Sequence, residues 1–253
     1  MKLSDIDWFK WNGTKCTTYG MHVLSQPSIV SPLERSERVT VPGKSGSLTL
    51  LEGDYIYDDI ALSCSCVVDD ISAIPAITGW LRGKGEIEFA SRQGGYYKGR
   101  IANQISFEKA VQGNPHRLFS VQFQCEPFFY LNSGKTAQTF SGTTVSIENP
   151  GNVPSMPLIK LNKASGKDTG TIMLLDGNTM IVTFAEEDQE TLSSITLDCE
   201  AKIAYSGAGT ALSPRVLRGT RVQGDWLTIP VGFQYFSLTD LDSVVITPRW
   251  RMI

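Results

Sequence analysis

Histidine is nearly absent from this chain, whose 253 residues include only His22 and His116. A serine-type triad or a zinc hydrolase needs a histidine beside a nucleophile or a second ligand. The sequence offers no Gly-x-Ser-x-Gly elbow and no His-Glu-x-x-His pair. We therefore predict no catalytic residues, and we interpret both histidines as surface or loop residues.

The chain also lacks a strong excess of charge and any long apolar run. Its formal net charge is −3, which gives no general attraction to nucleic acid or to an anionic membrane. No apolar run approaches the ~20 residues that span a bilayer, so we expect neither nucleic-acid sequence recognition nor membrane insertion. The first eight residues carry acids and no signal-peptide-like hydrophobic region, so we do not expect export by the general secretory route.

Cysteine is too scarce and too scattered for a disulfide framework. An odd number of widely spread cysteines in a chain of this size predicts reduced thiols. Cys64 and Cys66 are separated by one residue, whereas a zinc knuckle has two to four intervening residues. On a strand both thiols share one face and become small core residues, so we predict no metal site. The five cysteines are Cys16, Cys64, Cys66, Cys125 and Cys199.

One short motif resembles part of a phosphate-binding loop but lacks the rest of that signature. Gly43-Lys44-Ser45 has the end of a phosphate-binding loop, but the signature requires a glycine where the chain has Arg38. It also requires a following helix, whereas residues 47–51 read as a strand. A β-turn at Pro42-Gly43 explains the sequence better, and we predict no cofactor.

Strand-like alternation dominates the first half of the chain. Residues 60–68 and 117–125 alternate apolar and polar side chains with period two, which is typical of strands with one buried face. Residues 35–66 contain two strand-like runs bounded by the turns Pro42-Gly43 and Gly53-Asp54. Residues 86–91 and 96–108 read as a hairpin turned at Gln93-Gly94-Gly95, because paired glycines allow the positive φ of a tight turn.

One segment has helical rather than strand periodicity. Between Asp70 and Gly83 the apolar side chains recur at helical spacing, at positions 71, 74, 77 and 81. Ser72 could cap the start, Pro75 suits a first turn and Gly83 suits a C-terminal stop. The sequence predicts one short helix packed on a sheet, with a bulged loop as the alternative.

A small, polar stretch beginning near residue 131 predicts a domain boundary. We expect a first domain at 1–135, a linker at 136–150 and a second domain at 151–253. The second domain contains short strand-like runs at roughly ten-residue spacing, which is typical of a β-sandwich or jelly roll. These runs are 156–161, 171–175, 180–184, 194–198, 233–238 and 243–250. The expected fold class is therefore mainly β, a β-sandwich-like first domain with one short helix followed by a second β-sandwich.

Two functional alternatives remain open at this stage. The second domain carries aromatic residues that could stack on sugars, which would make the chain a carbohydrate-binding, lectin-like module. Trp226 and Trp250 are the possible carbohydrate or partner contacts, and Phe233, Tyr235 and Phe236 are the other aromatics of this region. Acidic groups at 58–59, 69–70 and 186–188 could in principle serve a wall-degrading hydrolase, although all three groups fall at the ends of predicted elements.

The order of several short motifs carries a resemblance to a known family. The first half contains Arg38-Val-Thr-Val-Pro-Gly43, Tyr57-Asp-Asp-Ile60, Trp80-Leu-Arg-Gly-Lys-Gly85, Tyr97-x-Gly99-Arg100 and Phe123-x-Cys125-Glu-Pro127-Phe-Phe-Tyr130. The second contains Asn149-Pro-Gly151-Asn-Val-Pro-Ser-Met-Pro157, Ile195-Thr-Leu-Asp198, Gly224-Asp225-Trp226 and Ile246-Thr-Pro-Arg249-Trp250. In this order and spacing they resemble the distal tail protein family of long-tailed bacteriophages, or siphophages.

The resemblance implies a structural role at the tip of a phage tail. Members form a hexameric ring whose first domains continue the tail tube, and whose second, galectin-like domains offer docking sites. The implied partners are other copies of the chain, the tail tube protein, a tail-tip or tail-fibre protein and a receptor-binding protein. The implied location is the virion tail tip, assembled in the host cytoplasm. The chain is shorter than forms with inserted carbohydrate-binding modules, which favours a plain hub without enzymatic activity.

Overall fold

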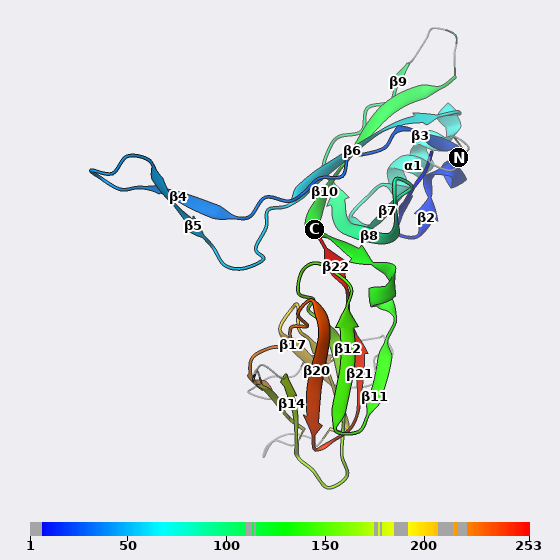
Figure 1. Ribbon diagram of the computed structural model, residues 1–253. Coiled ribbons are helices and arrows are strands. Elements are labelled where there is room, and N and C mark those ends of the chain that lie inside the picture. The colour runs from blue at the N-terminus through cyan, green and yellow to red at the C-terminus, as the bar shows by residue number, and fades with distance from the viewer. Residues whose placement is uncertain are drawn as a thin grey trace. The chain divides into compact units, whose positions relative to one another are not determined.

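The computed structural model describes residues 7–109, 113, 115–174, 177, 179–184, 192–206, 215–216 and 222–253. Its internal contacts divide the chain into two compact units, Met1–Tyr130 with Ile253 and Leu131–Met252. Strands make up most of both units (Figure 1). The predicted mainly β fold class is therefore confirmed.

The first unit is built on one curled antiparallel sheet with the order β2-β1-β7-β8-β10-β6-β3, and β9 also pairs with β10. A separate two-stranded sheet, β4-β5, belongs to the same unit. The strands are β1 (Phe9–Trp11), β2 (Thr14–Lys15), β3 (Met21–Ser25), β4 (Ser36–Thr40), β5 (Ser47–Leu51), β6 (Ile60–Val68), β7 (Lys84–Phe89), β8 (Arg92–Ile101), β9 (Glu108–Lys109) and β10 (Arg117–Leu131).

The two alternating sequences form the centre of this sheet. The strand β6 spans the predicted 60–68 and pairs in register with the predicted 117–125 portion of β10, from Ile60 opposite Cys125 to Val68 opposite Arg117. Period two directs Leu62 and Phe123 to the same buried face. Phe123 meets Phe9 and Phe89 edge to face, with ring centroids 5.5 and 5.7 Å apart. These rings form the core of the unit.

The predicted helix is present and short. A 3₁₀ turn at Ile71–Ala73 leads into α1 (Ile74–Trp80), with Pro75 in the first turn as expected. Asp70, and not Ser72, caps the start, because its carboxylate accepts the backbone N–H of Ser72 at 3.0 Å. Ile77 is buried and Trp80 stacks on Phe9, with ring centroids 5.7 Å apart. The helix therefore covers the aromatic core.

The β7–β8 hairpin turns earlier than predicted. Phe89 pairs with Arg92, so the turn lies at Ala90-Ser91 and the three residues Gln93, Gly94 and Gly95 belong to β8. A Cβ on Gly95 would lie 2.3 Å from the carbonyl oxygen of Tyr130. Gly95 is thus needed for the close approach of two strands and not for the turn.

The second unit is a sandwich of two antiparallel sheets, as predicted. One sheet has the order β11-β21-β13-β16-β17-β18 and the other β12-β20-β14-β15-β19. The strands are β11 (Gln138–Ser141), β12 (Thr144–Asn149), β13 (Leu158–Lys163), β14 (Thr169–Leu174), β15 (Thr179–Thr183), β16 (Ser194–Asp198), β17 (Ile203–Ser206), β18 (Arg215–Val216), β19 (Val222–Gly224), β20 (Gly232–Thr239) and β21 (Leu241–Thr247). The chain ends with β22 (Arg251–Met252).

The two sheets bury one continuous apolar core, to which Ile159, Leu161, Ile195, Val244 and Ile246 contribute fully buried side chains. Residues 136–150, expected to be a linker, instead supply β11 and β12, one to each sheet. Their small, polar composition reflects edge strands with one exposed face, which composition alone does not distinguish from a loop. No helix in the described part of the chain has the length and apolar character needed to cross a membrane.

Candidate assembly surfaces

The hairpin β4–β5, here called the arm, is the most exposed part of the first unit. It forms a sheet of its own, and nearly all its residues are exposed. In Figure 1 the arm stands clear of the other strands of its unit. A solitary two-stranded hairpin has little stability in water. The arm therefore needs an additional contact.

The two faces of the arm differ in chemistry. Val39 pairs with Leu48 and Glu37 with Leu50, so these four side chains share one face. Leu48 and Leu50 are 43% and 47% exposed. Arg38 and Thr40 lie opposite Thr49 and Ser47 on the other face, which also carries Leu51, paired with Ser36 and 57% exposed. The face of Val39, Leu48 and Leu50 is thus the more apolar of the two, and its own unit does not cover it.

The base of the arm is held in place by paired backbone and charge. The backbone N–H of Arg35 donates to the carbonyl of Ile56 at 3.0 Å, and that of Asp58 donates to Leu33 at 3.0 Å. The Arg35 guanidinium lies 3.0 Å from Asp58 and 3.7 Å from Glu52. The arm is therefore a defined extension and not a free loop.

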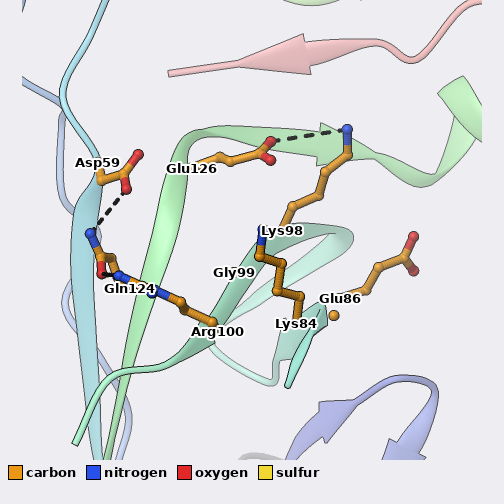
Figure 2. Close-up of a pocket in the computed structure, with 9 residues that line it drawn as sticks. Asp59, Lys84, Glu86, Lys98, Gly99, Arg100, Gln124 and Glu126 are labelled. Atoms are coloured by element: carbon orange, nitrogen blue, oxygen red, sulfur yellow. Dashed lines mark hydrogen bonds and ion pairs between the residues drawn. The ribbon is translucent and has the colours of Figure 1, made fainter. Parts of the chain in front are cut away.

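A polar groove of about 560 Å³ lies on the first unit, between β7, β8 and β10 (Figure 2). Glu126 accepts a hydrogen bond from the Tyr130 hydroxyl at 2.9 Å and lies 4.0 Å from Lys98. Arg100 donates to the Gln124 amide oxygen at 2.7 Å, and Gln124 donates to Asp59 at 3.1 Å. The lining residues are Asp59, Lys84, Gly85, Glu86, Lys98, Gly99, Arg100, Gln124 and Glu126.

Charged side chains of both signs line the groove. Neighbouring donors engage the Asp59 and Glu126 carboxylates. Lys84 and Arg100 stand directly opposite each other on β7 and β8, an arrangement of like charges that destabilises a sheet.

The structure brings the two histidines together, which the sequence did not predict. His22 Nδ1 lies 2.8 Å from Asp7, and His22 Nε2 lies 3.4 Å from Asp69. His116 Nδ1 lies 3.3 Å from the same Asp69 carboxylate. Both imidazoles are partly exposed at strand ends, as expected. The two histidines and two aspartates thus link the ends of β1, β3, β6 and β10.

All five cysteines are free and buried. The Cys64 and Cys66 sulfurs lie 3.7 Å apart on β6, as two core thiols on one strand face. Burial raises the pKa of Cys16 to about 11 and that of Cys199 to about 12, so both stay protonated at neutral pH. Within the described residues, no group of three or more His, Cys, Asp or Glu side chains is arranged to hold a metal ion.

The acidic groups considered for a hydrolase serve other purposes where they are described. Asp58 pairs with Arg35, and Asp69 faces the histidines. Asp70 caps the 3₁₀ turn before α1. The third group, 186–188, lies outside the described residues. The described acids therefore act as caps and ion-pair partners.

The two tryptophans named as possible ligand contacts have different surroundings. Trp250 is only 3% exposed and lies in the core of the second unit. Its ring therefore offers no face to a ligand. Trp226 is partly buried and lines a cavity of about 430 Å³ together with Met156, Met180 and Pro230. Only Trp226 could contact a ligand without opening the core.

Motif residues of the second unit meet in space. The Arg249 guanidinium makes two hydrogen bonds to the Asp198 carboxylate, at 2.8 and 2.9 Å. Asn149 is buried, donates to the carbonyls of Val153 and Ile229, and accepts from the N–H of Gly151. These contacts hold the motif segments of the sandwich together.

Comparison with solved structures identifies the fold. The Dit (gp 19.1) protein of phage SPP1, described as a paradigm of the hub adsorption apparatus in phages that infect Gram-positive bacteria, matches with a TM-score of 0.70 and 16% identity, covering 94% of this chain and 97% of that chain. The phage P2 baseplate in its activated conformation with Ca matches with a TM-score of 0.53 and 9% identity, over 94% and 96% of the two chains. The same baseplate with Sr gives 0.50 and 10%, with the same coverage.

No protein-family model and no curated protein matches the sequence. At identities of 9–16% the likeness concerns the fold, and it extends over both units. The chain therefore has the fold of phage distal tail and baseplate hub proteins. The resemblance predicted from the sequence motifs is confirmed at this level.

Proposed function

We propose that this chain is the structural hub at the tail tip of a long-tailed phage or prophage. In this proposal six copies form a ring that joins the tail tube to the baseplate, to tail-tip or tail-fibre proteins and to a receptor-binding protein. The ring assembles in the bacterial cytoplasm and ends up in the virion. The observation that carries the proposal is the fold shared with the SPP1 Dit protein over 94% of the chain. The proposal assigns no catalytic step to the chain.

The arm supplies a physical reason for self-association. Its apolar face is exposed within a single copy, and covering Leu48, Leu50 and their neighbours removes apolar surface from water. A neighbouring copy is the partner in this proposal. Each copy then presents one arm and receives another, which is a heterologous contact, and such contacts generate a ring when the rotation closes.

Sedimentation velocity of the purified chain and two arm variants tests this proposal. We expect the wild type to sediment as one large species. L48S/L50S, which makes the apolar face polar, should sediment as a monomer. T40A/T49A changes the polar face of the same arm and should assemble like the wild type. A wild type that stays monomeric at every concentration, or an L48S/L50S variant that still assembles, would contradict it.

A further inference from the structure

The outer face of one sheet of the second unit carries two exposed aromatic rings. In β20 the alternation directs Phe236 and Leu238 into the core, and Phe233 and Tyr235 outward. Phe233 is 66% exposed and Tyr235 47%. Their Cα atoms are about 6.8 Å apart, twice the rise of a strand residue. The outward positions of a sandwich strand are normally polar, so this pair of rings needs another explanation.

The neighbouring edge strand places hydrogen-bonding groups beside these rings. In the register of β12 with β20, Glu148 stands opposite Phe233 and Ser146 opposite Tyr235. Side chains of directly paired residues emerge on the same face with their Cβ atoms about 5 Å apart. Within the described part of the chain, the Glu148 carboxylate and the hydroxyls of Ser146 and Tyr235 have no hydrogen-bond or ion-pair partner. We call the four residues Ser146, Glu148, Phe233 and Tyr235 the Phe233–Tyr235 platform.

We propose that the Phe233–Tyr235 platform binds a neutral oligosaccharide. The C–H face of a pyranose ring is apolar and stacks on an aromatic face, while the hydroxyls at its edge need acceptors. Glu148 is a charged and therefore strong acceptor for such hydroxyls, and Ser146 adds a second acceptor. No Lys or Arg of the described residues forms an ion pair with Glu148, so its negative charge disfavours anionic polymers. The ligand class is thus neutral or N-acetylated sugars in a linear chain.

The size of the patch favours a sugar over a protein partner. Beyond the two rings, the exposed large apolar side chains beside it are Met173 on β14 and Val231 just before β20. Ser237 and Thr144, which pair with each other, limit the apolar surface along the strands. A stable protein interface buries about 800 Å² per partner, whereas an oligosaccharide needs only the ring faces and a few acceptors.

The platform lies elsewhere than the two tryptophans first considered for sugar binding. Trp250 is in the core, and Trp226 lines a cavity with methionine and proline side chains. Phe233 and Tyr235 instead offer open ring faces beside unused acceptors. This binding does not depend on ring assembly, so the two proposals can fail separately.

Isothermal titration of the full chain with cellohexaose and with N-acetylchitohexaose tests the platform. We expect the wild type to bind at least one of these neutral hexasaccharides, and F233A and Y235A each to weaken binding at least tenfold. Both side chains are exposed, so both variants should keep the wild-type Tm. Tyr55→Ala removes a comparably exposed tyrosine from the first unit and should bind like the wild type.

The E148K variant, which reverses the charge at Glu148, tests the role of this residue separately from that of the Phe233 and Tyr235 rings. The wild type should not bind polygalacturonate, an anionic polysaccharide, and E148K should bind it. Absence of binding to both hexasaccharides would overturn the proposal, as would F233A and Y235A binding as tightly as the wild type. Loss of a tail-protein contact in F233A, without any sugar binding by the wild type, would reassign the patch to a protein interface. Sedimentation of the same samples reports on assembly independently.

Discussion

Asn149 illustrates how single polar residues of the motifs hold the second unit together. Its buried side chain joins three backbone groups, those of Gly151, Val153 and Ile229. Asn149→Ala would leave all three without this partner, and a buried unpaired group costs about 1–3 kcal/mol. We expect the variant to lose about 3 kcal/mol of unfolding free energy, measured by urea denaturation of the second unit.

The control for this variant is Asn132→Ala. Asn132 is exposed, and its side chain makes no hydrogen bond or ion pair within the described residues. We expect its urea midpoint to stay near that of the wild type. An equal loss in both variants would mean that the hydrogen bonds of Asn149 do not stabilise the sandwich.

The Asp198–Arg249 pair makes the second unit sensitive to acid. Burial alone raises the pKa of the Asp198 carboxyl, but the Arg249 guanidinium and the N–H groups of Ala201 and Glu200 lower it by more, so the net shift is downward. A carboxyl with a lowered pKa in the folded state stabilises that state at pH values above its unfolded pKa, about 3.9. This contribution disappears as the pH falls through the lowered value.

Arg249→Met should therefore destabilise the protein at neutral pH by about 2 kcal/mol, the range for hydrogen bonds to charged groups. The difference between wild type and variant should shrink as the pH falls below about 4. Thermal unfolding between pH 3 and pH 7 measures this difference. Arg35→Met, which removes the exposed pair with Asp58, should change stability little at any pH. A pH-independent effect of Arg249→Met would refute the electrostatic explanation.

At the scale of elements, the β8–β10 contact depends on Gly95. A Cβ there would lie 2.3 Å from the Tyr130 carbonyl oxygen and 2.6 Å from the Phe129 ring. Gly95→Ala must displace one strand, and overpacking of this kind costs about 1–3 kcal/mol. Gly79→Ala, in the helix α1 with open space around the added methyl, should instead gain about 0.5–1 kcal/mol. Urea denaturation of the first unit compares the two.

The elements that could be predicted from the sequence are those with a strong local pattern. The alternation of 60–68 and 117–125 predicted β6 and its partner strand, because one face of each is buried throughout. The hairpin turn was predicted too late, since Gly94 and Gly95 suggested a turn where the requirement was interstrand space. The cap was assigned to Ser72, although Asp70 is two residues nearer the strand end and its carboxylate caps the 3₁₀ turn that leads into α1.

The apolar face of the arm was harder to predict, because it depends on which side chains the rest of the chain leaves exposed. The sequence showed the strand character of residues 35–66, and within 47–51 Leu48 and Leu50 alternate with Ser47 and Thr49. Whether the rest of the chain covers that face is a tertiary property. The same holds for Trp250, whose sequence context did not show that it faces the core.

At the scale of the whole molecule, two β units carry most of their polar chemistry in caps, ion pairs and strand edges. Both histidines, the five cysteines and several of the described acids join strands or fill the core. Among the described surfaces, the apolar face of the arm is left uncovered in a single copy. We therefore place the proposed self-association of the chain at this face of the arm.

Imaging the purified chain by negative-stain electron microscopy tests this central claim most directly. The account predicts closed rings with an open centre, formed by the chain alone and absent from the L48S/L50S variant. Fields of separate single copies at concentrations where sedimentation was performed, or open filaments in place of rings, would contradict it.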